Sequence, residues 1–233
     1  MRHVVAGMSP APEKAAETGA DADPLREFLP DLGVEPVRPG GDQERALIAA
    51  STRVQPKVEA PPIDPAAEVS YVLGSFNRRR LLERAVNSIR ADCSGLRYEI
   101  IVVDGGSDDG SIEWICAQKD VIGIVQHNRY IKDGESRRRM SWGRFMNIGF
   151  RAASAPWIAM ISDDCYLLPG STKAALTRVA AAEAAGLRVG GCAFYYRNWP
   201  SEDRYYVQRT LGGNLMVNHG LYSRSAMVDV GYA

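Results

Sequence analysis

The sequence lacks any long apolar segment. No apolar run approaches the ~20 residues that a membrane-spanning helix requires. The N-terminal stretch MRHVVAGMSPAPEKAAETGA contains no apolar core of roughly 7–15 residues, so it does not read as a signal peptide. These absences predict a cytoplasmic protein without a transmembrane segment, whose contact with a membrane would be peripheral.

Cysteine is scarce and net charge is absent. Cys93, Cys116, Cys165 and Cys192 stand far apart without a CxxC pair, which argues against a zinc site or a disulfide framework and predicts free thiols. The 28 basic and 28 acidic residues cancel. Whole-chain charge therefore gives no case for a nucleic-acid partner, and we expect none.

Aromatic residues are almost absent from residues 1–66. Only Phe28 of the 19 aromatic residues lies there, with ten of the 13 prolines and an excess of acidic over basic residues, 11 to 7. Such a segment buries little apolar surface. We predict a flexible proline-rich arm over 1–66, in which DPLREFLPDLGV is an alternative docking element, and a folded domain over 67–233.

From Val69 onward, apolar runs alternate with segments of helical spacing. This alternation predicts an α/β fold with a mostly parallel sheet and helices on both faces. The expected strands are VSYVLGS, YEIIVVD, VIGIVQH, WIAMIS and RVGGCAFYYR, and the expected helices are RRRLLERAVNSIRADC, SIEWICAQK, WGRFMNIGFRAAS and STKAALTRVAAAEAAG.

Acidic residues follow two of these strands. Asp104 ends a strand and opens the turn GGSDDGS, where it can bind a nucleotide or simply belong to a turn that begins the next helix. Asp163 and Asp164 follow WIAMIS, where a carboxylate can hold Mg²⁺ or Mn²⁺ beside phosphate oxygens. The alternative for this pair is an exposed turn.

A third motif, DGESRRRMSWGRFMNIGF over residues 133–150, is rich in arginine. Arg137, Arg138, Arg139 and Arg144 suit phosphate recognition through paired hydrogen bonds, although a solvated run of charge is the alternative. Asn147 lies within the apolar helix that follows and is either a functional residue or an ordinary polar one.

In this order, the motifs resemble those of family 2 glycosyltransferases, which have the GT-A fold. SFNR resembles the family's T-Y-N-R, VVDGGSDDGS its V-V-D-D-G-S-T-D-G-T, and GRFMNIGFRAASAPWIAMISDD the stretch that leads into its D-x-D-like motif. The sequence departs from the pattern at three positions. Gly74 stands where the family usually has proline, and Gly105 and Ser162 each stand where it usually has an acid.

The resemblance implies Asp164 as the ligand of Mg²⁺ or Mn²⁺. It also implies a set of residues that bind the nucleotide of the donor. These residues are Ser75, Asn77, Asp104, Asp109, Asn147 and Asp163.

The implied reaction moves a sugar from a nucleotide-diphosphate donor to an acceptor hydroxyl with inversion. The acceptor would be a saccharide, a lipid-linked molecule or a protein. The family's usual general base would lie beyond Ala233, so we expect a C-terminally incomplete GT-A domain. The alternatives are a non-catalytic GT-A module that binds nucleotide sugars and, ranked below it, a sugar-nucleotide nucleotidyltransferase.

Two further interpretations stay open. His219 is a metal ligand, an acceptor contact or, as we favour, a histidine hydrogen-bonded inside the fold. Four aromatic residues line an acceptor groove or, more simply, pack in the core. They are Trp142, Tyr195, Tyr196 and Trp199.

Limited proteolysis tests the division near residue 66. The arm should be trimmed first, because it has little to bury, and should leave a core that begins near Val69. Mass spectrometry of the resistant fragment gives its boundary. Protection of Phe28 and its neighbours would show instead that the arm docks on the domain.

Overall fold

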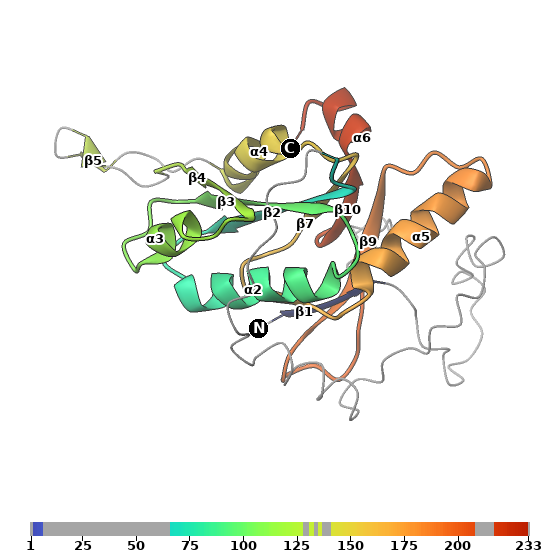
Figure 1. Ribbon diagram of the computed structural model, residues 1–233, viewed down its shortest axis with the longest axis horizontal. Helices are drawn as coiled ribbons and strands as arrows, with labels where there is room; N and C mark the ends of the chain where they lie inside the picture. Colours follow the sequence, from blue (N-terminus) through green and yellow to red (C-terminus); the bar gives the residue numbers. More distant parts are fainter. Residues whose placement is uncertain are drawn as a thin grey trace.

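The computed structural model describes residues 2–6, 66–127, 131–132, 135–136, 141–207 and 217–232, with backbone only for the first, third and fourth of these ranges. Within them, one sheet has eight strands in the order β4-β3-β2-β7-β10-β9-β1-β8, and a separate pair joins β5 to β6 (Figure 1). The strands are β1 (Arg2–Ala6), β2 (Val69–Ser75), β3 (Tyr98–Asp104), β4 (Val121–Val125), β5 (Ile131–Lys132), β6 (Glu135–Ser136), β7 (Trp157–Met160), β8 (Cys165–Leu167), β9 (Gly191–Asn198) and β10 (Gly220–Ser223). The helices are α2 (Arg79–Asp92), α3 (Ser111–Cys116), α4 (Trp142–Ala152), α5 (Ser171–Ala184) and α6 (Arg224–Asp229).

Four parallel strands form one half of the sheet. β2 lies at its centre, with β3 and then β4 on one side and β7 on the other, all parallel. Nearly every residue of β2 and β3 is buried, because helices cover both faces. Continuous apolar runs are typical of such strands. The predicted mostly parallel sheet with helices on both faces is therefore confirmed.

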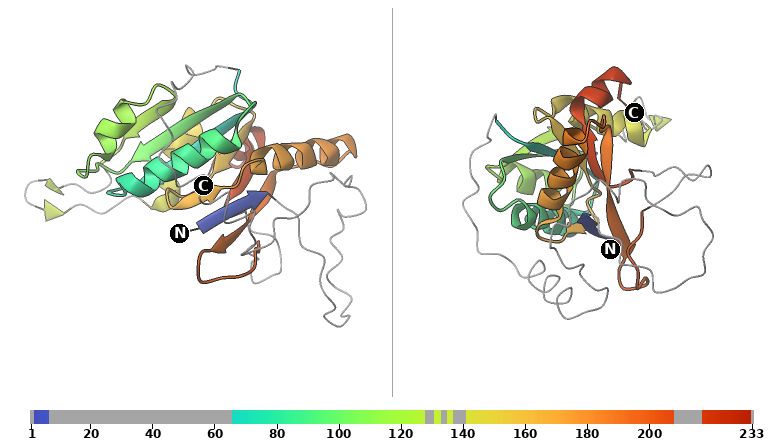
Figure 2. Two further views of the ribbon diagram at one scale, coloured as in Figure 1. Left: turned by 60° about the horizontal axis from the view of Figure 1, so that its bottom comes forward. Right: turned by 90° about the vertical axis from the view of Figure 1, so that its right-hand side faces the viewer.

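Alternate residues of β2 point to two different cores. Tyr71 and Leu73 pack on the face covered by α2, whereas Val72 packs on the face covered by α4. Figure 2 shows these helices on opposite sides of the sheet. At Gly149 a Cβ would lie 2.5 Å from Val72 Cγ1, so glycine lets α4 approach the sheet closely.

The other half of the sheet is mixed, which the sequence did not predict. β10 is antiparallel to both β7 and β9, and neither β10 nor β8 was expected as a strand. The short lengths of β8 and β10 explain the omission, because three or four residues show too little alternation to be recognised. The strand expected over RVGGCAFYYR is present as β9.

β1 lies within the predicted N-terminal arm. It pairs parallel with β8 and antiparallel with β9, so residues 2–6 belong to the sheet rather than to a free segment. The stretch RHVVA can form such pairs because its two valines favour strands. Residues 7–65 lie outside the described residues, and for them the flexible arm stays a prediction.

No helix in the described part of the chain is long and apolar enough to cross a bilayer.

A buried acid at the end of α2 caps α5. The first residue before α5 is Gly170, which offers no side chain to the helix N-terminus. Asp92 takes this role, because its Oδ2 accepts hydrogen bonds from the Thr172 backbone N–H at 3.1 Å and from the Thr172 hydroxyl. The Tyr71 hydroxyl donates to the same oxygen at 3.3 Å. Burial raises the pKa of Asp92 to about 6, although these hydrogen bonds act to lower it.

This raised pKa predicts a stability that depends on pH. Asp92 has an ordinary pKa of 3.8, so the protonated form is favoured by folding, and its stabilising effect is present near pH 4 and lost as the pH rises through about 6. The loss is at most about 3 kcal/mol. In urea denaturation, the free energy of unfolding of Asp92→Asn relative to the wild type should therefore increase from pH 4 to pH 7. A difference that stays constant across this range would contradict the raised pKa of Asp92.

Candidate functional site

The candidate site lies at the carboxyl end of the parallel strands. β2 ends at Ser75, whose register partner is Asp104, the last residue of β3. In open α/β sheets, ligands bind beyond this edge. A pocket of about 500 Å³ is found there. Its walls come from the end of β2, the loops after β2 and β3, and the first turns of α4. The last residue of β7, residues 161–164 after it and residues 218–219 before β10 complete them.

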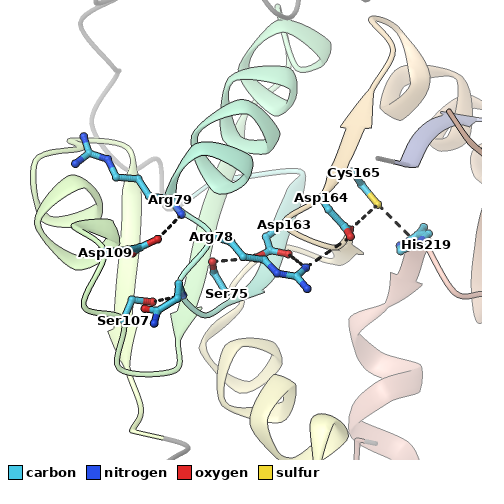
Figure 3. A network of polar contacts seen from close by, with 10 residues as sticks. Ser75, Arg78, Arg79, Ser107, Asp109, Asp163, Asp164, Cys165 and His219 are labelled. Carbon is cyan, nitrogen blue, oxygen red and sulfur yellow. Dashed lines mark hydrogen bonds and ion pairs between the residues drawn. The ribbon is translucent and has the colours of Figure 1, made fainter. Parts of the chain in front are cut away.

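Two adjacent carboxylates face this pocket. Oδ2 of Asp163 accepts a hydrogen bond of 2.9 Å from the Ser75 hydroxyl. Nη1 of Arg78 lies 3.2 Å from Oδ1 of Asp163 and 3.6 Å from Oδ2 of Asp164 (Figure 3). A buried carboxylate needs such partners to offset its loss of hydration. The chain tolerates an acid pair here because the last residue of β2 supplies a donor and the loop after β2 supplies a positive charge.

Burial distinguishes the two acids. Asp163 is 4% exposed, whereas the side chain of Asp164 is 30% exposed. Burial raises the pKa of Asp163 above its ordinary value, and the Ser75 hydrogen bond and the Arg78 charge partly oppose that rise. Asp163 is thus held from several directions, and Asp164 is the carboxylate that remains accessible to an incoming cation.

Asp104 is fully buried and organises the turn that follows β3. Its Oδ1 accepts hydrogen bonds from the backbone N–H groups of Gly106 and Ser107, at 2.8 and 2.7 Å. Its Oδ2 accepts from the Ser107 hydroxyl at 2.7 Å. Gly105, not Asp104, contributes to the pocket wall. Both oxygens of Asp104 are therefore engaged within the turn.

The turn after β3 is fastened to the loop after β2. The backbone N–H of Asn77 donates to the Ser107 hydroxyl at 2.8 Å, and the Asn77 amide oxygen accepts from the Asp108 N–H at 2.9 Å. Asn77 has a φ of 52°, a left-handed conformation that asparagine tolerates better than most residues. Arg78 is the next residue, so this fastening fixes the backbone from which its side chain reaches the acids.

Asp109 adds a third connection between the two loops. Its Oδ2 accepts from the Arg79 N–H at 2.9 Å, and its Oδ1 accepts from the Ser111 N–H at 3.1 Å, at the start of α3. Slight burial acts to raise the pKa of Asp109, but these hydrogen bonds outweigh it and lower the pKa. Asp109 therefore joins the first turns of α2 and α3 as an ionised cap.

His219 also lines the pocket and is 2% exposed. Its Nε2 is 3.8 Å from Sγ of Cys165, which is itself 3.9 Å from Oδ1 of Asp164. Its ring also packs edge-on against Tyr196, with centroids 5.3 Å apart. The histidine is thus buried in the fold and borders the site, which keeps the sequence alternatives for it open.

The predicted nucleotide residues fall into two groups. Ser75 and Asp163 line the pocket, as does the predicted metal ligand Asp164. Asn77, Asp104 and Asp109 form the supporting turns, and Asn147 is half-buried on α4 outside the described pocket wall. The arginines at 137–139 lie outside the described residues.

Sequence reasoning missed Arg78 as a site residue. It recognised SFNR as a motif but assigned Arg78 no role, and the signal was its place directly after the strand end and Asn77. Trp142 also lines the pocket and is 59% exposed, whereas it was expected more simply in the core.

The acid pair suits a divalent cation that shares its coordination with a ligand. No cluster of three or more His, Cys, Asp or Glu side chains within the described residues could enclose a metal ion. Mg²⁺ is usually held by one or two carboxylates, with phosphate oxygens and water completing its shell. Asp163 and Asp164, at the wall of an open pocket, provide that donor set.

Two solved structures show low similarity to this chain. One is the mannosyltransferase PcManGT from Pyrobaculum calidifontis, in complex with GDP-Man and Mn²⁺, at 19% identity and a TM-score of 0.38, covering 59% of this chain and 41% of that one. The other is S. aureus TarS 1-349 in complex with UDP-GlcNAc, at 15% identity and a TM-score of 0.45, covering 70% of this chain and 47% of that one. The chain thus spans less than half of each.

A curated relative is more similar in sequence. The succinoglycan biosynthesis protein ExoO of Rhizobium meliloti (strain 1021) is 28% identical over 130 residues, which are 55% of this chain and 34% of the relative. Residues 70–227, more than half of the chain and all of the pocket wall, match the family described as Glycosyl transferase family 2. The α/β fold agrees with that match, and the chain belongs to glycosyl transferase family 2.

Proposed function

We propose that this chain transfers a sugar from a nucleotide-diphosphate donor to an acceptor hydroxyl, with inversion and with the aid of a divalent metal ion. Membership of the family supports the reaction class. The observation that carries the proposal is the pair Asp163 and Asp164 at the carboxyl edge of the sheet, within a pocket of about 500 Å³. The relative named for succinoglycan biosynthesis supports a saccharide acceptor, free or lipid-linked.

Each acid has a different proposed role. Asp164 is the accessible metal ligand, and Asp163 supports the cation while it is held by Ser75. Bound there, Mg²⁺ or Mn²⁺ would offset the negative charge that develops on the leaving diphosphate. The four cysteines are free, which supports a reducing compartment such as the cytoplasm.

The turns behind the pocket hold the nucleotide half of the site in shape. We assign Asn77 and Asp109 to this role, because they join the loops after β2 and β3. Asp104 acts in the same way through Ser107, and the pocket-lining Ser75 is the proposed direct contact. Asn147 remains a proposed nucleotide residue on α4.

A non-catalytic nucleotide-sugar-binding module is the second candidate. The described pocket wall contains no carboxylates besides Asp163 and Asp164, and both lie within ion-pair distance of Arg78. Asp163 is buried and hydrogen-bonded by Ser75, so we do not assign it the role of general base. Release of nucleoside diphosphate together with a glycosylated acceptor supports the transferase. Binding of UDP or GDP, with no glycosylated product formed from any acceptor supplied, supports the module.

Thermal shift with Mn²⁺ and either UDP or GDP tests the metal ligand. At a nucleotide concentration of 100 times Kd, binding to the folded state adds about 2.7 kcal/mol. This corresponds to a rise in Tm of roughly 5–11 °C for a chain of this size. Asp164→Asn should abolish the Mn²⁺-dependent part of the rise, whereas Asp229→Asn, an exposed acid on α6, should retain it. A full Mn²⁺-dependent rise in Asp164→Asn would remove Asp164 from the metal site.

The role of Asp104 is tested by comparing two variants. Asp104→Ala should weaken UDP or GDP binding by about 1–3 kcal/mol, roughly the cost of losing hydrogen bonds to a charged group. If Asp104 acts through its turn, Ser107→Ala should also weaken binding, because Ser107 joins Asp104 to Asn77. Isothermal titration gives both affinities. Weakening in Asp104→Ala alone would favour direct contact between Asp104 and the nucleotide.

A further inference from the structure

The Arg78 guanidinium lies where the proposed function requires a divalent cation. One nitrogen, Nη1, is 3.2 Å from Asp163 and 3.6 Å from Asp164, so a single positive group serves both acids. We propose that Arg78 is an exchangeable counter-ion, which neutralises the acid pair in the ligand-free protein and moves to the donor diphosphate when metal and nucleotide bind. This inference rests on the proposed function.

Arg78 and the cation cannot both keep the same oxygens. A divalent ion bound to these carboxylates would lie about 2 Å from their oxygens, next to the guanidinium that now contacts them. Two positive groups at such a separation repel each other, and the low exposure of Asp163 reduces screening by water. Metal binding to the oxygens that Arg78 contacts therefore requires the guanidinium to leave.

The side chain of Arg78 can leave without moving the backbone. Its carbonyl accepts hydrogen bonds from the N–H groups of Leu81 and Leu82, each at 2.9 Å, and so begins α2. The preceding residue, Asn77, is fastened to Ser107 and to the Asp108 N–H. In contrast, the Arg78 side chain is 51% exposed. A fixed backbone with a half-exposed side chain is suited to exchange between two nearby partners.

A diphosphate in the pocket offers the second partner. Arg78 itself lines the pocket, together with Ser75 and Gly105. Guanidinium groups bind phosphate oxygens through two parallel hydrogen bonds, which lysine cannot reproduce. Once the cation takes over the acids, Arg78 can pair with the diphosphate, and its positive charge is again compensated.

This exchange couples the two ligands. When metal binds alone, it displaces the Arg78 guanidinium, which then has no new partner. When a nucleoside diphosphate binds as well, its phosphate oxygens become the new partner of the guanidinium. Each ligand therefore increases the affinity of the other by the same factor, as linkage requires. Loss of Arg78 should strengthen the binding of metal alone, weaken that of the nucleotide, and reduce the coupling.

The experiment titrates Mn²⁺ into the full chain with and without UDP or GDP, following free Mn²⁺ by electron paramagnetic resonance. Arg78→Ala should lower the Kd for Mn²⁺ alone about 10-fold and reduce the wild-type coupling factor, expected at roughly 5–150, to near 1. Arg78→Lys keeps the charge, so the weak binding of Mn²⁺ alone should stay unchanged. The same variant should bind UDP or GDP more weakly. Arg80→Ala, an exposed arginine on α2, controls for net charge and should match the wild type.

The outcomes separate this inference from the proposed function. Suppose that Mn²⁺ and UDP or GDP bind together, but that Arg78→Ala binds Mn²⁺ alone no more tightly than Arg80→Ala does. The exchange is then wrong, and the proposed function stands. If neither nucleotide binds with Mn²⁺ to the wild type or any variant, both are wrong. Should Arg78→Ala fail to fold by circular dichroism, unchanged nucleotide affinity in Arg78→Lys would overturn the exchange.

Discussion

A carboxylate that leaves water at the end of a strand needs a hydrogen-bond donor and a positive charge, and the end of β2 and the loop after it supply both to Asp163. Ser75 donates to one oxygen and Arg78 pairs with the other. This compensation permits the chain to place Asp164 beside it at the pocket wall. The same contacts join β2 to the segment after β7, so the edge of the sheet and the site depend on one interaction.

The loops around the pocket are ordered by polar groups that do not face it. Asp104 shapes the turn after β3, Ser107 and Asn77 fasten this turn to the loop after β2, and Asp109 joins the first turns of two helices. Such supporting contacts determine how precisely a site can present its functional groups. The acids and Arg78 are thus the pocket-lining members of a larger polar network that spans both loops.

The sequence predicted those parts that depend on local pattern. The buried runs of β2 and β3, and the apolar spacing of α2, identified the parallel half of the sheet and its edge. It did not predict β8 and β10, because strands of three and four residues show too little alternation to be recognised. For Asp104 the sequence left a nucleotide contact and a turn residue as alternatives, and only the structure shows that both of its carboxylate oxygens accept hydrogen bonds within the turn.

The long separation between Ser75 and Asp163 has a consequence for how the protein folds. They are 88 positions apart, whereas β2 and β3 are joined through α2 and pair across about 29 positions. Closing the longer loop costs more chain entropy, so we expect the β2-α2-β3 unit to form before β7 docks. Until then Asp163 remains hydrated. The pocket is consequently a late product of folding, and a nascent chain acquires its acid pair only after the central parallel strands have assembled.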